Sequence, residues 1–306
     1  MGVTHIRTPK NFVLEERLER YADGFETHAE SLAGRWAEAC YPLRSGTCDC
    51  RRDGQAKMRG DAPGSSASPC RHRRFDHVEL DLGCGKGAYI IQAARQRPDT
   101  LFLGMDAEPL CIAYAAQYIL ESGLPNVLAI PRGADSVPRV FAKGELSGIT
   151  LNFSTPFPRA HDVRRRLTTA ARLDAYRGVL APGGTITLRT DSQPLRDWTL
   201  TQLAAAGYKT LWTSDDTRAE HPELPTTEYE SRLVDRGARV WSVCATPGDA
   251  PSREQLESAL EADPSLMSYL PDDLENLDYV PLGMEDAVRN FINRRRRAAM
   301  GARQKH

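Results

Sequence analysis

The sequence predicts an α/β protein built on a mostly parallel sheet, and three observations support this fold class. Short apolar segments alternate with helix-length segments between residues 76 and 246, a glycine-rich loop follows the first apolar segment, and no helical crossover is expected between the last two. Strands joined by helical crossovers run parallel, and helices then cover both faces of the sheet. The last two strands are therefore expected to form an antiparallel pair.

The expected elements follow from this pattern. Helices are expected over 87–97, 108–122, 163–180 and 192–207. Strands are expected over 77–82, 101–106, 126–131, 147–153, 183–190, 208–214 and 238–246. Seven strands in this arrangement predict a Rossmann-like, doubly wound, mostly parallel sheet with an antiparallel final strand.

Composition limits the classes of protein that fit. The chain has 306 residues and a net charge of −1, which allows one large α/β domain or two smaller ones. No apolar run is long enough to cross a bilayer, so no membrane partner is expected. The first residues lack the charged-then-apolar order of a signal peptide, and we expect a cytoplasmic protein.

Four segments differ in composition. Residues 1–43 form a charged N-terminal segment with helical character, and residues 44–75 form a flexible insertion rich in Cys, Arg and Gly. Residues 76–246 carry the strand and helix pattern, and residues 247–306 form a basic, helical C-terminal extension. The last helix of this extension has one apolar stripe and ends in four arginines, so packing on the domain and contact with RNA are both open.

Seven cysteines in a cytoplasmic chain are not expected to form disulfides. Four of them surround the insertion together with a histidine: Cys40, Cys48, Cys50, Cys70 and His72. This spacing is able to hold zinc, but it lacks the paired Cys-x-x-Cys knuckles of strong zinc motifs. We predict no metal site, and the role of the insertion stays open.

A loop led by an acid follows the first strand. Its sequence, DLGCGKG, places Asp81 before Gly83, Gly85 and Gly87. Glycines let the backbone turn tightly and let a ligand approach where a Cβ would stand. The spacing differs from the Gly-x-Gly-x-x-Gly of dinucleotide sites, which hold a pyrophosphate at a helix N-terminus. Asp106 ends the second strand, at the sheet edge where ligands bind in such folds.

This arrangement is suited to S-adenosylmethionine, which has no phosphate but carries an ammonium and a sulfonium that favour a nearby carboxylate. An acid at the position of Asp106 is able to accept both ribose hydroxyls. The alternative is that the glycines only form a tight turn between a strand and a helix. Three alternating glycines with an acid before them and a second acid at the next strand end favour the cofactor site.

A second unusual loop follows the fourth strand. The segment LNFSTPFPRAHDVRRRLT, residues 151–168, passes from an apolar run through Pro-Phe-Pro into Arg164, Arg165 and Arg166. Clustered arginines attract phosphate even when the net charge of a chain is close to zero. The two interpretations are a ligand-binding loop beside a phosphate-binding helix start, and a rigid turn beside a solvated helix face.

From about Val78 to Val243 the chain resembles the bacterial tRNA (guanine-N(7)-)-methyltransferases. Their loop after the fourth strand reads Asn-Phe-Pro/Ser-Asp-Pro-Trp-Pro-Lys, followed by His and Lys-Arg-Arg-Leu, and the same frame gives NFSTPFPRAHDVRRRLT here without a gap. LRTDSQPL and TTEYESR are similar to the family's Thr-Asp strand end and its Thr-x-Tyr/Phe-Glu-x-Arg motif. The resemblance implies a class I, S-adenosylmethionine-dependent enzyme that methylates the 7-position nitrogen of a guanine in tRNA.

The resemblance also implies roles for particular residues. Phe157 replaces the usual tryptophan as a stacking face, Arg159 is the cation of the loop, and the arginines that follow are expected to meet the tRNA backbone. Asp191 and Glu230 are the implied carboxylates for the donor edge of guanine, with Thr227 as a hydrogen-bonding neighbour. Because the 7-position nitrogen has a lone pair and no proton, catalysis would rest mainly on positioning.

Two positions depart from the family's pattern. Thr155 stands where the family has its principal catalytic aspartate, and Gly133 stands where an acid is expected after the third strand. Asp135 lies two residues later and is expected to contribute to the cofactor site instead. Asp162 is the candidate for supplying the charge that the substrate loop lacks.

The leading hypothesis is therefore a tRNA (guanine-N(7)-)-methyltransferase with tRNA as its partner. The alternatives are a weakened or inactive tRNA-binding relative of the same fold, and a methyltransferase for another RNA site or a small molecule. At the site itself, Asp191 as a strand cap and Glu230 paired on the surface with Arg232 or Arg236 are the structural alternatives. The sequence does not distinguish a monomer from a homodimer.

Overall fold

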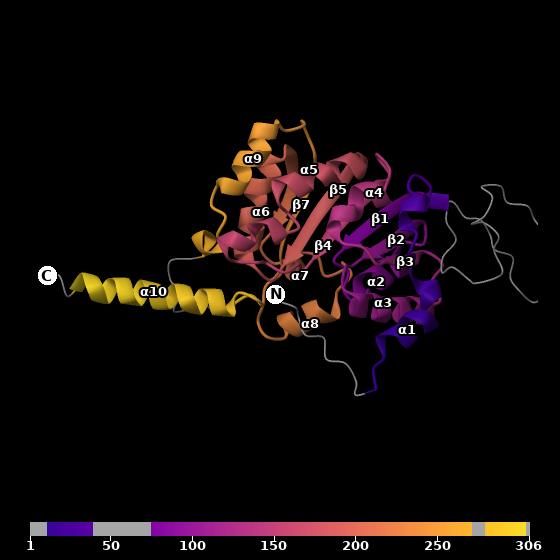
Figure 1. Cartoon of the computed structure of the whole chain (residues 1–306), viewed down its shortest axis with the longest axis horizontal. Helices are drawn as coiled ribbons and strands as arrows, with labels where there is room; N and C mark the ends of the chain where they lie inside the picture. Colours follow the sequence, from indigo (N-terminus) through magenta and orange to yellow (C-terminus); the bar gives the residue numbers. More distant parts are fainter. Residues whose placement is uncertain (1–10, 39–74, 271–278, 304–306) are drawn as a thin grey trace, which may run out of the picture. The chain divides into compact units, whose positions relative to one another are not determined.

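The computed structural model describes residues 11–38, 75–270 and 279–303 (Figure 1). Among these residues seven strands form one mixed sheet: β1 (His77–Leu82), β2 (Thr100–Met105), β3 (Val127–Ile130), β4 (Leu146–Asn152), β5 (Leu180–Thr190), β6 (Tyr208–Ser214) and β7 (Trp241–Pro247). Their order is β3-β2-β1-β4-β5-β7-β6. The predicted fold class, a doubly wound and mostly parallel sheet with antiparallel pairing at its end, is confirmed.

The chain divides into two compact units, one ending at Ser147 and one beginning at Gly148, and each is described by itself. The first contains the helices α1 (Leu14–Arg20), α2 (Ala88–Gln96), α3 (Pro109–Ser122) and α4 (Val137–Val140). The second contains α5 (Ala170–Val179), α6 (Gln193–Ala205), α7 (Thr217–Glu220), α8 (Glu228–Val234), α9 (Arg253–Glu261) and α10 (Glu285–Arg303).

In the first unit, β1 pairs in parallel with β2, and β2 pairs in parallel with β3. All six residues of β2 are buried, so both faces of this strand are covered. A nearly continuous apolar run such as LFLGM is what a central parallel strand requires, because it has no solvent face. The carboxyl ends of β1 and β2 meet at Leu82 and Met105, which are register partners.

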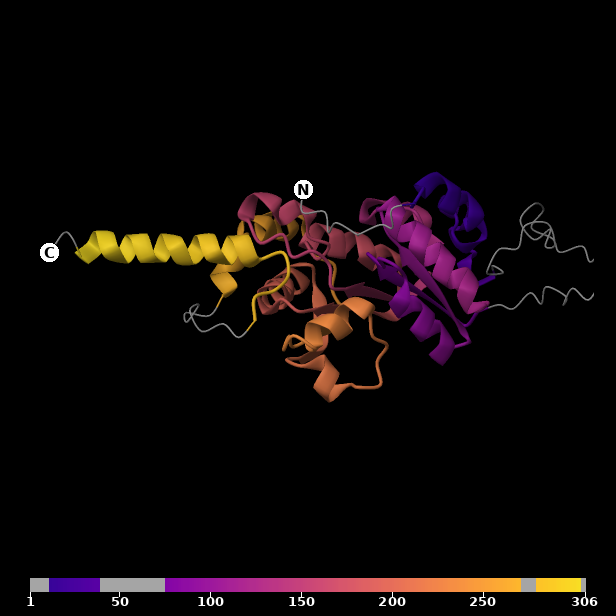
Figure 2. The same cartoon turned by 90° about the horizontal axis from the view of Figure 1, so that it is seen from below.

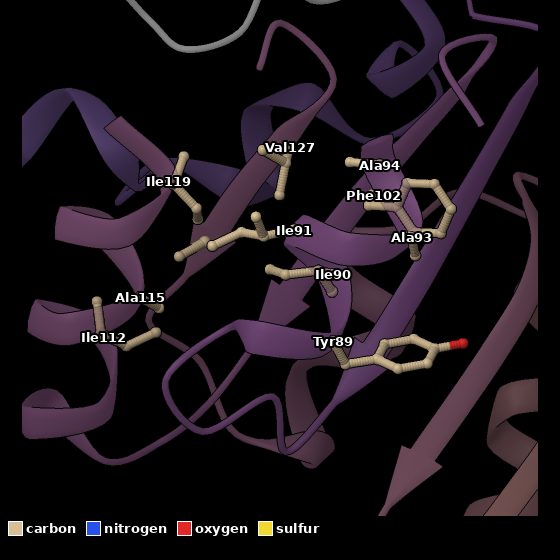
Figure 3. Close-up of a cluster of buried hydrophobic side chains, with 11 residues drawn as sticks. Tyr89, Ile90, Ile91, Ala93, Ala94, Phe102, Ile112, Ala115, Ile119 and Val127 are labelled. Atoms are coloured by element: carbon tan, nitrogen blue, oxygen red, sulfur yellow. The ribbon is translucent and has the colours of Figure 1, made fainter. Parts of the chain in front are cut away.

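The core of this unit lies where α2 and α3 pack on one face of β2 and β3 (Figure 3). Side chains from all four elements meet there: Ile90 and Ile91 from α2, Ile112, Ala115 and Ile119 from α3, Phe102 from β2 and Val127 from β3. The two helices run beside each other in both views of the whole chain (Figures 1 and 2). This packing fixes the start of α2, and with it the glycine loop that precedes α2.

Local signals in the sequence set the ends of α3. The Glu108 carboxylate accepts a hydrogen bond from Leu110 N, Pro109 fits the first turn, and Gly123 ends the helix with a φ of +64°. An acceptor and a proline at the start, with glycine at the end, is the usual asymmetry of helix termini. The expected helix 108–122 is thus present within one residue.

The N-terminal segment packs on the same unit. Phe25 forms an isolated parallel bridge with Ala129 of β3, and the Arg132 guanidinium at the end of β3 pairs with the Glu30 carboxylate at 2.8 Å. Trp36 is fully buried and its indole Nε1 donates to Val140 O. Of the expected helical character in residues 1–43, the described part contains α1 and three short 3-10 turns.

In the second unit, β7 runs antiparallel to both β5 and β6. Two short helices, α7 and α8, lie between β6 and β7. These short helices were not predicted, but they form no crossover, because β6 and β7 are adjacent and antiparallel as expected. The expected helix 163–180 was also too long, because residues 160–165 form a 3-10 turn and the side chain of Thr169 caps α5 at its true start.

The insertion with Cys40, Cys48, Cys50 and Cys70 lies outside the described residues except for Phe75, and the division of the chain into four segments stays a prediction. In the described ranges there is no group of three or more His, Cys, Asp or Glu placed to hold a metal ion. A search of the same ranges finds no helix that is long and apolar enough to cross a membrane.

Close packing under the glycine loop makes Gly104 intolerant of a side chain. A Cβ on Gly104 would lie 2.6 Å from Ile90 Cδ1 and 2.8 Å from Cys84 Sγ, whereas a Cβ on Gly178 of α5 would meet nothing within 4 Å. We expect Gly104→Ala to lower the free energy of unfolding by about 1–3 kcal/mol. Gly178→Ala is the matched control, and should be neutral or stabilising by up to about 1 kcal/mol. Urea unfolding measures both, and equal effects would contradict the described packing.

Candidate functional site

The glycine loop closes onto the end of β2. Gly83 N and Cys84 N both donate to Met105 O, and Gly87 N donates to Cys84 O. Gly85 has a φ of +54° and a Cβ there would meet nothing within 4 Å, so this side of the loop is open to a ligand. Cys84 is buried beneath the loop, and burial raises the pKa of its thiol well above the usual value. Cys84 is therefore a packing residue.

Asp106 holds the loop in this shape. Its Oδ2 accepts from Gly85 N at 2.9 Å, and its Oδ1 accepts from Glu108 N at 2.9 Å. Burial raises the pKa of the Asp106 carboxyl, while the two backbone donors oppose that rise. A carboxylate has about four lone-pair sites, so Asp106 keeps acceptor capacity for hydroxyl groups of a ligand.

The other residues predicted for the cofactor lie on the same unit. Asp81 is buried within β1, at 2% exposure. Gly133 follows β3, and a Cβ on it would lie 3.6 Å from the Cβ of Ala107, directly after Asp106. The position from which the family's acid is missing is therefore next to the end of β2. Asp135, its expected replacement, is exposed and sits in a 3-10 turn.

The loop after β4, within residues 151–168 and called the substrate loop after its predicted role, is held in an unusual backbone conformation. Phe153 and Phe157 have φ values of 50° and 45°, in the left-handed region that bulky residues rarely adopt. Phe153 N donates to Arg189 O, and its ring contacts the edge of Tyr229 at 5.5 Å between centroids. Backbone strain of this kind persists only where surrounding contacts hold it, and it occurs most often at functional sites.

Arg166 is one of the residues that hold this loop. It is 1% exposed, and its guanidinium donates to Pro156 O, Phe157 O and Pro264 O. The guanidinium also lies over the ring of Trp198, and burial lowers its pKa to about 10. The expectation that Arg166 meets the tRNA backbone was wrong, because its side chain is buried and its guanidinium binds carbonyl groups of the protein.

The neighbouring charges remain at the surface. Arg164 and Arg165 are exposed, and Arg165 lies 4.1 Å over the ring of Phe157. Arg165 also donates to Asp162, which lowers the pKa of that carboxyl. Thr155 and Arg159 are exposed as well. The loop therefore offers an aromatic face, a hydroxyl and several cations, with its acid already paired to an arginine.

Asp191 sits immediately after β5 and is 7% exposed. Its Oδ2 accepts from the hydroxyl of Tyr279 at 2.7 Å and from Leu282 N at 3.0 Å. Burial raises the pKa of the Asp191 carboxyl, and both hydrogen bonds act in the opposite direction. Asp191 is thus more than a strand cap, since its side chain binds a segment almost 90 residues later in the chain.

Glu230 occupies a different environment from the one expected. It is fully buried, and both carboxylate oxygens accept from Arg189 Nη2, at 2.7 and 2.8 Å. Arg218 Nε is 3.2 Å from Oε1. Thr227 and Glu230 also form the capping box at the start of α8, with Glu230 N donating to the Thr227 hydroxyl. In this structure both residues hold α8 in place, and the alternative of a surface pair with Arg232 or Arg236 does not apply.

Comparison with known proteins decides the family. A family model described as "Putative methyltransferase" matches residues 76–243. The tRNA (guanine-N(7)-)-methyltransferase of Levilactobacillus brevis is 34% identical over 52% of this chain and 74% of its own length. The chain belongs to the tRNA (guanine-N(7)-)-methyltransferase family. The family member from Geobacillus kaustophilus is 35% identical over 54% of this chain and 76% of its own length.

Among solved structures, that of the 16S rRNA methyltransferase KamB matches 57% of this chain and 89% of its own length, with 24% identity and a TM-score of 0.45. The family assignment confirms the resemblance expected from the loop and strand-end motifs, and it makes this chain an enzyme of the methyltransferase class.

The roles of Arg166, Arg189 and Tyr279 were missed by sequence reasoning. Arg166 lies in a run of arginines that looks like surface charge and Arg189 lies in a mainly apolar strand, yet both are buried. For Thr227 and Glu230, the sequence did contain a signal: their spacing fits a capping box, which predicts a helix start at this point. Tyr279 comes from the extension beyond the matched residues, and nothing near it in the sequence pointed to Asp191.

The burial of Glu230 leads to a stability prediction. Glu230→Gln would leave the buried guanidinium of Arg189 without its counter-charge, so we expect a loss of about 3 kcal/mol in the free energy of unfolding. Glu257→Gln, which breaks an exposed pair with Arg253, is the control and should change it by less than about 0.5 kcal/mol. Unchanged stability together with lost tRNA affinity would instead identify Glu230 as a substrate-binding residue.

Proposed function

We propose that this family member transfers a methyl group from S-adenosylmethionine to the 7-position nitrogen of a guanine in tRNA. The observation that carries the proposal is the similarity to the tRNA (guanine-N(7)-)-methyltransferases, which reaches 34% identity over 52% of this chain. We also propose that residues 76–246 act as the methyltransferase domain. Since tRNA is a cytoplasmic substrate, the reaction belongs in the cytoplasm.

The glycine loop fits the proposed cofactor. Gly85 leaves open space where any other residue would place a Cβ, and Asp106 is half-buried at the strand end with acceptor capacity left for ribose hydroxyls. Asp81 supplies a buried negative charge near the loop that favours a cationic ligand. Asp135 follows β3 in the sequence and is exposed, so of the proposed cofactor residues it has the least structural support.

The substrate side is proposed to hold guanine by stacking and by its donor edge. Phe157 offers a ring face, and Arg159 is an exposed cation on the same loop. Asp191, when ionised, is able to accept hydrogen bonds from the N–H groups of guanine. Thr227 and Glu230 contribute by holding α8, and with it Tyr229, beside Phe153.

The chemistry requires positioning more than proton transfer. S-adenosylmethionine, when bound, would supply a methyl group on a positively charged sulfur: the guanine nitrogen would form the new N–C bond as the S–C bond breaks, and the sulfur would leave with that electron pair as the neutral thioether of S-adenosylhomocysteine. No proton leaves the nitrogen in that step, and a side chain of this protein need only orient the base. Thr155 is therefore able to replace an aspartate without removing a required general base.

One observation favours a second candidate, a weakened or inactive tRNA-binding protein. Thr155 is exposed and uncharged at the position of the family's aspartate, and Asp162 is already paired with Arg165. A purified enzyme incubated with labelled cofactor and tRNA from a strain lacking the endogenous activity separates the two. We expect labelled tRNA that is cleaved by borohydride and aniline at the modified guanine, whereas tight tRNA binding without methylation would contradict the proposal.

The effect on catalysis of the negative charge that is missing at position 155 is open to a direct test. If a carboxylate at this position helps to orient guanine, Thr155→Asp should raise kcat by about tenfold, the effect of one hydrogen bond to a charged group. Thr155→Asn has a similar size without the charge and should stay near the wild-type rate. Equal rates for all three proteins in a steady-state methylation assay would show that the charge at this position is dispensable.

The exposed arginines lead to a binding prediction. Arg164→Ala should weaken tRNA binding and reduce the slope of log Kd against log salt by about 1, because one phosphate contact is lost. Arg95, which is exposed at the end of α2, is the control and should leave the slope unchanged as Arg95→Ala. Filter binding at several salt concentrations measures both. A slope unaffected by Arg164→Ala would assign Arg164 to a solvated face.

A further inference from the structure

The C-terminal extension, which lies beyond the residues matched by the family model, is attached to the substrate loop. Leu266 N donates to Pro158 O at 3.0 Å. Arg166, at the end of the same segment 151–168, donates to Pro264 O at 2.8 Å. A Cβ on Gly283 would lie 3.8 Å from the ring of Pro156. The extension thus contacts the loop in two regions, at Pro264 and Leu266 and again at Gly283.

The same extension reaches the strand-end acid. The hydroxyl of Tyr279 and the backbone N–H of Leu282 both donate to Asp191 Oδ2, and the Ser192 hydroxyl donates to the sulfur of Met284 at 3.1 Å. Met284 is fully buried, so it anchors this end of the segment. Val288, at the start of α10, is buried too. Residues 279–284 are therefore held against the protein by hydrogen bonds and by buried side chains.

We propose that residues 279–284 form part of the substrate side of this enzyme and that Tyr279 is a positioning residue for Asp191. The proposal rests on the function proposed above, in which Asp191 binds the donor edge of guanine. Two donors on one carboxylate oxygen fix the plane of the carboxylate. About two lone-pair sites on the other oxygen then remain for the N–H groups of the base.

Tyr279 also supports the ionised form of Asp191. Burial raises the pKa of Asp191, and the Glu285 carboxylate on α10 raises it further, whereas the hydrogen bond from Tyr279 lowers it more than any other contact. Tyr229 on α8 is the other titratable group facing Asp191, and burial raises the pKa of its phenol, so it stays neutral. Only an ionised carboxylate is a pure acceptor for guanine, so the Tyr279 hydroxyl keeps Asp191 in its useful form.

The opposite role for the segment makes an opposite prediction. Asp191 is 7% exposed, and the O–H and N–H groups of Tyr279 and Leu282 occupy the carboxylate in the way that a base would. If the segment only blocks the acid, removal of the hydroxyl should increase activity. If it positions the acid, the same change should decrease activity. The direction of the change therefore separates the two.

Tyr279→Phe is the test, because it removes the hydroxyl and keeps the ring. We expect kcat/KM for tRNA methylation to fall by about tenfold and the acid limb of its pH profile to move to higher pH, since Asp191 then ionises less readily. The tRNA Kd should stay within about twofold, because phosphate contacts dominate affinity. Tyr208→Phe is the control: it removes a comparable hydrogen bond to Leu173 O and should leave the pH profile in place.

Binding of guanosine 5′-monophosphate, measured by NMR titration with adenosine 5′-monophosphate as reference, separates this proposal from the proposed function. Tyr279→Phe and Asp191→Asn should each weaken guanosine 5′-monophosphate binding, and the double variant should be no weaker than Asp191→Asn alone. If the wild type methylates no tRNA but this pattern holds, the proposed function fails and the positioning role stands. Wild-type or higher values for Tyr279→Phe in both assays would overturn the positioning role.

Discussion

The hydrogen bond from Gly85 N–H to the Asp106 carboxylate is the interaction on which the rest of the cofactor side depends. It joins the loop after β1 to the end of β2, so one contact sets both the curvature of the glycine loop and the orientation of the acid. Because Gly104 has no side chain, Cys84 of the loop is able to pack directly against the backbone of β2. Sheet, loop and acid therefore form one rigid group around an open side at Gly85.

The substrate side obeys a different constraint, because its loop adopts a conformation that it would not keep alone. Two phenylalanines with positive φ are costly, by about 1–3 kcal/mol each in general. The buried guanidinium of Arg166 offsets this by binding the loop carbonyls from inside, and the ion pair of Arg189 with Glu230 fixes α8 beside the loop. The buried arginines Arg166 and Arg189 therefore stabilise the backbone of the loop and of α8, and they are not available to bind RNA.

The fold could be predicted from the sequence because its signals are local. The strand at 77–82 was placed to the residue, and α3 to within one, since apolar runs and caps such as Glu108 and Gly123 act over a few residues. Asp106 was found because it ends a strand. The burial of Arg166 and Glu230 was missed, since it depends on Pro264, 98 residues from Arg166, and on Arg189, 41 residues from Glu230. Tyr279 was missed for the same reason.

We propose that the glycine loop after β1, held in shape by Asp106, binds S-adenosylmethionine. Isothermal titration calorimetry with this cofactor, on the purified wild-type protein and on Asp106→Asn, measures this binding. We expect saturable heat for the wild type and binding weakened by about tenfold or more for the variant, because Asn lacks the charge and one acceptor oxygen. No heat for the wild type, or equal affinity for both proteins, would contradict it.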